Sequence, residues 1–219
     1  MFPRAGAHIG GITMSFDIEN WERREIYEFF SSVDQPFYSV TFRLDVTKLR
    51  RYTHAHGLSF YLALTYLVTE AMNSVPEFLL TIRNGVLTTL PRREPSFTDL
   101  VSGSECFKIV TYPAGGSMEA FCREARRASD AQQRFIVTES ESDALIFISC
   151  LPWVDITALT NERLFDFDDC VPRVTWGKYV ERDGRTELGL ALEVNHRVID
   201  GVHIGQFARR LEELIDALE

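Results

Sequence analysis

Apolar positions recur along this chain with two different periods, and together they predict helices and strands in an irregular order. Helical spacing marks residues 17–33, 47–57, 60–73, 117–133 and 202–218. Alternation or a short apolar run, typical of strands, marks residues 37–46, 79–82, 86–90, 107–112, 144–150, 173–181 and 187–194. Strands separated unevenly by helices favour an α/β fold of the two-layer α+β sandwich type. We therefore expect a mixed β-sheet covered by helices rather than regular βαβ winding.

Local signals sharpen some of these boundaries. Ser59 directly precedes the strongly apolar segment 60–73 and can cap it as a helix. That segment is too short for a membrane span, so it predicts a buried core helix. The sequence Arg83-Asn84-Gly85 separates two short strands, and because Asn and Gly tolerate positive φ it predicts a β-hairpin.

Length and composition indicate one domain. The chain has 219 residues, of which 45% are hydrophobic, enough for a sizeable core. We find no internal repeat and no Pro/Gly/Ser-rich linker, so we expect a short N-terminal extension, residues 1–15, before a single domain, residues 16–219. The 23 Lys and Arg against 32 Asp and Glu give a net charge of −9, which argues against a nucleic-acid partner.

Compartment signals point to the cytoplasm. No basic stretch followed by a long apolar run begins the sequence, and no apolar run approaches the ~20 residues of a membrane helix. The four cysteines show neither Cys-x-x-Cys pairs nor the short spacing of secreted domains; they are Cys106, Cys122, Cys150 and Cys170. We expect them to be reduced thiols in a cytoplasmic protein without a membrane partner.

The candidate chemistry lies between the last predicted strand and the last predicted helix, where the sequence has the form His-x-x-x-Asp-Gly. A histidine with an ordinary pKa of ~6.5 can accept a proton near neutral pH, so His196 is a candidate general base. Gly201 permits the sharp turn that would hold the ring rigidly. From these residues alone a second interpretation stays open, in which His196 is a polar residue at a strand end and Asp200 caps the helix.

Two other chemistries have less support. A metal site would pair His196 with His203 and a carboxylate, but no neighbouring cysteine and no His-Glu-x-x-His spacing accompanies them. We therefore expect no metal. A hydrolytic triad would need a nucleophile elbow, and the sequence contains no Gly-x-Ser-x-Gly.

Six blocks extend the motif into a pattern that covers nearly the whole chain from about residue 16. They are Asn20-Trp21-Glu22-Arg23-Arg24-Glu25, Ser59-Phe60-Tyr61, Pro76-Glu77-Phe78, Ile148-Ser149-Cys150-Leu151-Pro152-Trp153-Val154, Thr175-Trp176-Gly177-Lys178-Tyr179 and residues 195–205. In this order they resemble the chloramphenicol acetyltransferase family.

The resemblance implies a homotrimer with active sites at the subunit boundaries, where an acceptor hydroxyl attacks the thioester of acetyl-CoA. The expected acceptor is the 3-hydroxyl of chloramphenicol. His196 matches the catalytic base, and Ser149 matches the hydroxyl that donates to the oxyanion, a donor typically worth ~3 kcal/mol. Asp200 matches a buried carboxylate that holds the loop through a salt bridge, with Arg23 as its partner.

The resemblance also assigns binding residues. Thr175 matches a position near the acceptor, and four aromatic residues align with the apolar lining of the acceptor pocket: Phe29, Phe30, Tyr38 and Phe107. Three residues match positions near coenzyme A: Tyr61, Lys178 and Tyr179. Each could instead be an ordinary core or strand-surface residue.

The chain departs from the family at several places. Asn195 replaces a histidine that usually precedes the catalytic one, and Ser59 replaces a common lysine, which implies weaker binding of coenzyme A. Residues 134–143 and 155–169 also differ, where an acceptor could be recognised. Two alternatives stay open. The protein could be an acyltransferase for another acceptor, either another alcohol or the dihydrolipoyl thiol used by dihydrolipoyl acyltransferases, whose Asp-His-Arg-Val-Ile-Asp-Gly motif is similar to residues 195–201. It could also be a non-catalytic trimer that binds a small molecule.

Overall fold

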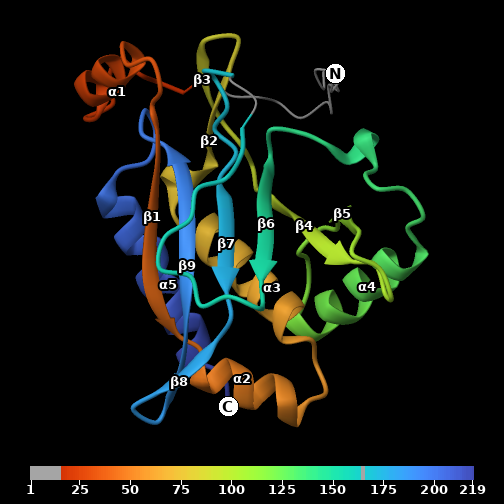
Figure 1. The fold of residues 1–219 in the computed structure, drawn as a ribbon. Helices are drawn as coiled ribbons and strands as arrows, with labels where there is room; N and C mark the ends of the chain where they lie inside the picture. The colour runs from red at the N-terminus through yellow and green to blue at the C-terminus, as the bar shows by residue number, and fades with distance from the viewer. Residues whose placement is uncertain (1–15, 164–165) are drawn as a thin grey trace.

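The computed structural model describes residues 16–163 and 166–219, so the expected N-terminal extension lies outside the described residues (Figure 1). Within these ranges, seven strands form the main sheet in the order β1-β9-β7-β6-β4-β5, with β8 paired to β9. The strands are β1 (Phe37–Asp45), β4 (Glu94–Leu100), β5 (Phe107–Thr111), β6 (Leu145–Leu151), β7 (Arg173–Gly177), β8 (Val180–Arg182) and β9 (Arg185–Asn195). The β4–β6 and β6–β7 pairs are parallel and the others antiparallel. The predicted mixed sheet is confirmed.

Helices cover one face of this sheet. The longer helices α3 (Phe60–Asn73), α4 (Met118–Ala131) and α5 (Gly201–Asp216) lie behind it in Figure 1, and α2 (Thr47–Ala55) closes its lower end. Side chains from β6, β7 and β9 that point toward the helices are almost wholly buried, among them Ile148, Val174 and Leu192. Burying each such side chain contributes ~1.5–3 kcal/mol, so the sheet and the helices form one core.

Smaller elements join the sheet to its surroundings. A short hairpin is formed by β2 (Leu80–Arg83) and β3 (Val86–Thr89), and the 3₁₀ turns are η1 (Pro76–Leu79) and η2 (Thr138–Ser140). Asn84 and Gly85 have φ of 53° and 76°, which confirms the predicted hairpin. Ser59 caps α3 by accepting a hydrogen bond from the Leu62 N–H, as predicted.

Three sequence predictions were wrong. The strand expected over residues 173–181 is broken into β7 and β8, because the Lys178 N–H donates to the Val154 carbonyl instead of to the sheet. The helix expected over residues 17–33 is only α1 (Arg24–Ser31). Ahead of it, Asn20 donates to the Asp17 carboxylate and Trp21 packs edge-on against Phe16, so local turn bonds and packing replace the first helical turns. Strand β4 was missed because a proline such as Pro95 argues against a central strand. In the structure Pro95 is tolerated because it is only the second residue of β4.

A connection between β6 and β7 crosses the sheet face that carries no helix (Figure 1). We call residues 152–163 the strap. The Lys178 N–H donates to the Val154 carbonyl at 2.7 Å, and Ser39 Oγ donates to the Leu159 carbonyl at 2.7 Å, so the strap contacts both β1 and the end of β7. A Cβ on Gly189 of β9 would lie 2.3 Å from the Ile156 carbonyl oxygen. The strap therefore packs directly on the sheet backbone.

No helix in the described ranges is both long and apolar enough to cross a membrane.

Gly189→Ala tests this close approach. The added methyl must displace the strap, and we expect it to lower the free energy of unfolding by ~1–3 kcal/mol, measured by urea denaturation. Gly205→Ala is the control, because no atom lies within 4 Å of a Cβ on Gly205 in α5. Alanine is the better helix former by ~0.5–1 kcal/mol, so this variant should be as stable as the parent or slightly more so. Equal stability of Gly189→Ala and the parent would show that the strap does not lie against β9.

Candidate active site

His196 is the first residue after β9, and its backbone and ring are both fixed. The His196 N–H donates to the Pro36 carbonyl at 2.6 Å, which ties the turn to the residue before β1. The imidazole stacks on Phe30 of α1 with ring centroids 3.8 Å apart and lies 4.3 Å from the Tyr38 ring. Its side chain is 27% exposed. The ring is therefore clamped between two aromatic side chains while part of it still faces the outside.

The surroundings keep this imidazole neutral. Burial lowers the pKa of His196 below its ordinary value, and the nearby Arg23 guanidinium lowers it further. The Asp200 carboxylate, whose Oδ1 is 3.8 Å from His196 Nε2, opposes these effects without cancelling them. A neutral ring has a lone pair ready to accept a proton, which suits a general base.

The predicted pair of Arg23 and Asp200 is formed. Arg23 Nη2 lies 3.5 Å from Asp200 Oδ2, and Arg23 Nη1 donates to the Val198 carbonyl at 2.6 Å. Asp200 Oδ1 also accepts from the Gly201 N–H at 2.6 Å and caps α5. Both sequence interpretations of this aspartate therefore hold. The expectation of a buried carboxylate needs correction for a single chain, because the Asp200 side chain is 38% exposed; only Arg23 is buried.

Two further side chains brace the turn, and sequence analysis gave neither this role. Arg197 is buried and donates to the Tyr27 hydroxyl at 2.9 Å and to Ser31 Oγ at 3.1 Å, so it fastens α1, which carries Phe30, to the turn. Asn195 accepts from the Arg197 N–H at 3.0 Å and donates to the Asp169 carbonyl at 3.1 Å. An amide at position 195 thus shapes the turn through its hydrogen bonds. The sequence did offer a signal for Arg197: it lies inside the motif next to apolar residues, and a cation buried there needs hydrogen-bond partners.

Hydroxyl groups form a row on the opposite, helix-free face of the sheet. Ser149 of β6 pairs with Thr175 of β7, which pairs with Ala191 of β9. Ser149 Oγ lies 3.2 Å from Thr98 Oγ1 on β4, and Thr175 Oγ1 donates to the strap residue Asn161 at 3.1 Å. Sequence analysis missed Thr98 because it missed β4. This row offers hydroxyl donors near the point where the strap crosses the sheet.

One chain does not bring His196 and Ser149 together. Ser149 lies level with Ala191, five residues before His196, and two strands away. At ~3.3 Å per residue and ~4.8 Å between strands, the two residues are separated by ~16 Å along the sheet and ~10 Å across it. A reaction that uses both groups must therefore take them from two subunits.

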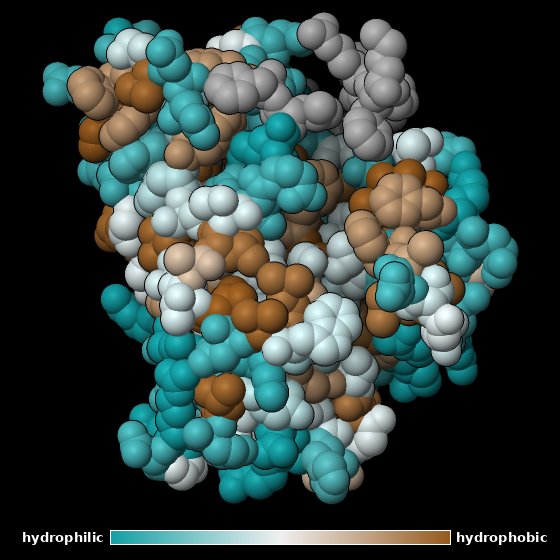
Figure 2. Space-filling model, in the orientation of Figure 1, coloured by the Kyte–Doolittle hydropathy of each residue, from teal (hydrophilic) through white to brown (hydrophobic). Residues whose placement is uncertain are grey.

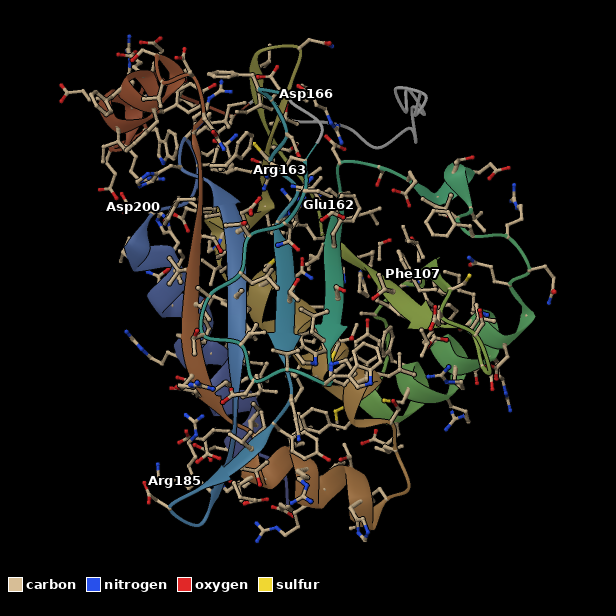
Figure 3. The ribbon with its side chains drawn as sticks, viewed as in Figure 1. Phe107, Glu162, Arg163, Asp166, Arg185 and Asp200 are labelled. Atoms are coloured by element: carbon tan, nitrogen blue, oxygen red, sulfur yellow. The ribbon has the colours of Figure 1, made fainter. Side chains whose placement is uncertain are left out.

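The four aromatic residues predicted to line the acceptor pocket are also separated within one chain: three lie near His196 and one does not. Phe30 and Tyr38 contact His196, and Phe29 packs edge-on against Phe30 with its own ring largely exposed. Phe107 lies on β5, at the sheet edge opposite β1, far from the labelled Asp200 (Figure 3). In one chain these four residues do not line a common pocket, so their shared role stays a prediction.

The predicted coenzyme residues gather near the lower ends of β4 and β7. The Tyr61 hydroxyl donates to the Thr98 carbonyl at 2.8 Å, and its ring packs on the core side chains Phe97 and Trp176. Lys178 is exposed. Tyr179 is partly exposed, between Phe60 and the Arg50 guanidinium. Contacts of these three residues with coenzyme A stay a prediction.

No group of three or more His, Cys, Asp or Glu side chains in residues 16–163 and 166–219 is placed to hold a metal ion.

Substitutions at Asp200 separate its two roles. Asp200→Asn keeps an acceptor for the cap but removes the charge that faces Arg23, and we expect the free energy of unfolding to fall by ~1–2 kcal/mol in urea denaturation at neutral pH. This is less than the ~3–5 kcal/mol of a fully buried pair, because Asp200 still contacts water. Asp200→Ala also loses the cap and should cost ~1 kcal/mol more.

The matched control is Asp216→Asn, which removes an exposed partner of Lys48. Exposed pairs contribute ~0–1 kcal/mol, so this change should be nearly neutral. If Asp200→Asn lowered the free energy of unfolding no more than Asp216→Asn does, the ion pair of Asp200 with Arg23 would contribute nothing measurable to stability.

Comparison with known proteins agrees with this geometry. The family model described as chloramphenicol acetyltransferase matches residues 13–212. Chloramphenicol acetyltransferase 3 of Escherichia coli is 28% identical over 214 residues, covering 92% of this chain and 96% of that protein. The chloramphenicol acetyltransferase of Clostridium perfringens is 28% identical over 208 residues, covering 93% and 94%.

Solved structures give the same result. A chloramphenicol acetyltransferase superposes with a TM-score of 0.84 at 26% identity, covering 93% of this chain and all of that one. A probable dihydrolipoamide acetyltransferase from Listeria monocytogenes, at 14% identity and a TM-score of 0.65, covers 90% of this chain and 93% of its own, and shares the fold. The family match covers most of the sequence and leads to one assignment: this chain belongs to the chloramphenicol acetyltransferase family.

Proposed function

We propose that this protein transfers the acetyl group of acetyl-CoA to a hydroxyl of a small acceptor, the 3-hydroxyl of chloramphenicol, with His196 as general base. The observation that carries the proposal is the setting of the His196 ring: it is stacked on Phe30 and partly exposed, and burial lowers its pKa. Its relatives that cover almost the whole chain are named for this acceptor, which supports the choice of chloramphenicol.

The residues suit each proton and charge movement of such a transfer. The neutral imidazole takes the proton of the acceptor hydroxyl as the oxygen attacks the thioester carbonyl. The oxyanion of the tetrahedral intermediate then accepts a hydrogen bond from the Ser149 hydroxyl, and a pre-placed donor of this kind is typically worth ~3 kcal/mol. When the carbon–sulfur bond breaks, the imidazolium returns its proton to the coenzyme A thiolate, and the base is neutral again.

We further propose that the site forms between subunits of a homotrimer, where His196 meets Ser149 of the partner subunit. The separation of these two residues within a chain supports this arrangement. The strap face supports it as well: Trp153 and Val154 are 69% and 54% exposed, and Figure 2 shows apolar side chains spread over the face that the strap crosses. Such a surface is typical of an interface.

Coenzyme A would bind at the lower ends of the central strands, where Lys178 offers an ammonium group to phosphates and Tyr179 a partly exposed ring to adenine. We propose a cytoplasmic location. The free cysteines, two of them buried, suit a reducing compartment.

Release of coenzyme A tests the activity. With acetyl-CoA and chloramphenicol, a thiol reagent should detect turnover by the parent, and His196→Ala should lower kcat by ~10²–10⁴-fold while the circular dichroism spectrum is unchanged. Other alcohols and dihydrolipoamide serve as competing acceptors, and a preference for one of them would replace chloramphenicol as the substrate. Saturable binding of chloramphenicol, with no thiol release in the presence of chloramphenicol or of any of the other acceptors, would contradict the proposed enzyme.

Mixed trimers test the shared site. His196→Ala and Ser149→Ala subunits, unfolded together and refolded as a mixture, should recover about one quarter of the parent activity, because one interface in four combines an intact His196 with an intact Ser149. Each variant refolded alone is the control and should stay at its own low level. Recovery no greater than the average of the two controls would place both residues in one subunit.

A further inference from the structure

A second histidine, His203, lies directly behind the turn that carries His196. It is the third residue of α5, and its side chain is only 5% exposed. His203 Nδ1 accepts a hydrogen bond from the Asp200 N–H at 2.9 Å, while the Asp200 side chain caps the same helix. The two residues thus cap the helix reciprocally, with an imidazole where a glutamate or glutamine usually stands.

This arrangement fixes the proton on the His203 ring. Nδ1 can accept only when it carries no proton, so the ring is neutral with its hydrogen on Nε2. Nε2 lies 3.7 Å from the Glu77 carboxylate of η1, which is longer than a hydrogen bond but close enough for the carboxylate to attract an N–H.

The charged groups that face His203 are Glu77 from η1, Arg23 from the segment before α1 and Asp200 from its own turn. Burial lowers the pKa of His203 and Arg23 lowers it too, against the opposing effects of Glu77 and Asp200. Both histidines of the motif region are therefore neutral at neutral pH.

We propose that neutral His203 is a positioning residue that holds the Asp200 backbone, and through it the His196 ring, in the geometry of the working base. The inference rests on the proposed function of His196. Asp200 connects the two histidines, because its N–H bonds His203 while its carboxylate contacts His196 and Arg23. Protonated His203 would turn an N–H toward the Asp200 N–H, and the two donors would push the turn out of place.

The proposal predicts a particular acid limb. Protonation of His196 removes the base, and protonation of His203 removes the acceptor that supports it, so kcat/KM should fall on acidification more steeply than the slope of one that a single protonation gives. Folding stability should fall in the same direction. Because both pKa values are lower in the folded protein than the ~6.5 of an unfolded chain, the unfolded state binds more protons as the pH drops below ~6.5.

His203→Asn and His203→Ala form the test. Asparagine places an amide oxygen where Nδ1 stands, so it can accept from Asp200 but cannot titrate; alanine offers no acceptor. With chloramphenicol and acetyl-CoA at neutral pH, we expect His203→Ala to lower kcat by about tenfold to a hundredfold, with KM for either substrate changing less. His203→Asn should recover most of that loss, and the acid limb of its kcat/KM should have a slope of about one.

An acid limb of the same slope in parent and His203→Asn would overturn the proposal. So would an asparagine variant that is as slow as the alanine variant although it is folded by circular dichroism.

A ¹⁵N NMR titration of the histidine rings in the parent gives a readout that does not depend on turnover. We expect the unprotonated signal of His203 at Nδ1 and an Asp200 amide shift that follows its titration. A hydrogen on His203 Nδ1 at neutral pH would show that this atom does not accept the hydrogen bond from the Asp200 N–H, and would overturn the proposal. If the parent released no coenzyme A with any acceptor, the proposed function would fail. The NMR result would still decide whether His203 Nδ1 accepts the hydrogen bond from the Asp200 N–H.

Discussion

The structure depends on one turn of five residues between β9 and α5, and on the buried guanidinium that supports it. Arg23 donates to the Val198 carbonyl and faces the Asp200 carboxylate, so a cation from the N-terminal segment organises a loop near the C-terminus. A buried cation needs such partners, and the chain supplies them only when the turn is closed. Arg197, inside the turn, fastens α1 in the same way. The position of the His196 ring follows from these two arginines and from the aromatic rings that they bring alongside it.

The second constraint is the sheet. Strand register places the hydroxyls of Thr98, Ser149 and Thr175 in one row, and the strap holds that row on the helix-free face. The same register keeps the row away from His196. A rigid sheet cannot bend to join them, so under the proposed function each subunit supplies two separate halves of a site. The proposed trimer accounts for this separation, because it lets the proposed base of one subunit meet the proposed oxyanion donor of another.

Sequence reasoning succeeded where one local force dominates. The apolar helix after Ser59 and the hairpin at Asn84-Gly85 were predicted because capping and positive φ act within a few residues. The turn after β9 was expected to bend at Gly201, but this glycine has no positive φ and is the first residue of α5. Sequence reasoning failed where tertiary contacts decide. Pro95 hid β4, whose pairing with β5 and β6 outweighs the missing N–H, and with β4 it hid Thr98. For Asp200 the pattern left a cap and an ion pair as alternatives, and only the fold shows that one carboxylate serves both.

The choice of histidine at the third position of α5 follows from charge. A glutamate there would cap the Asp200 N–H equally well. It would also add a carboxylate beside Asp200 and Glu77, which already share the Arg23 guanidinium as a neighbouring cation. Another negative charge so close would favour the imidazolium form of His196 and raise its pKa, whereas the proposed role as a base requires a neutral ring. A neutral imidazole supplies the same hydrogen-bond acceptor without that charge. The sequence thus meets a local requirement of the helix terminus with a residue that leaves the proton affinity of the neighbouring base low.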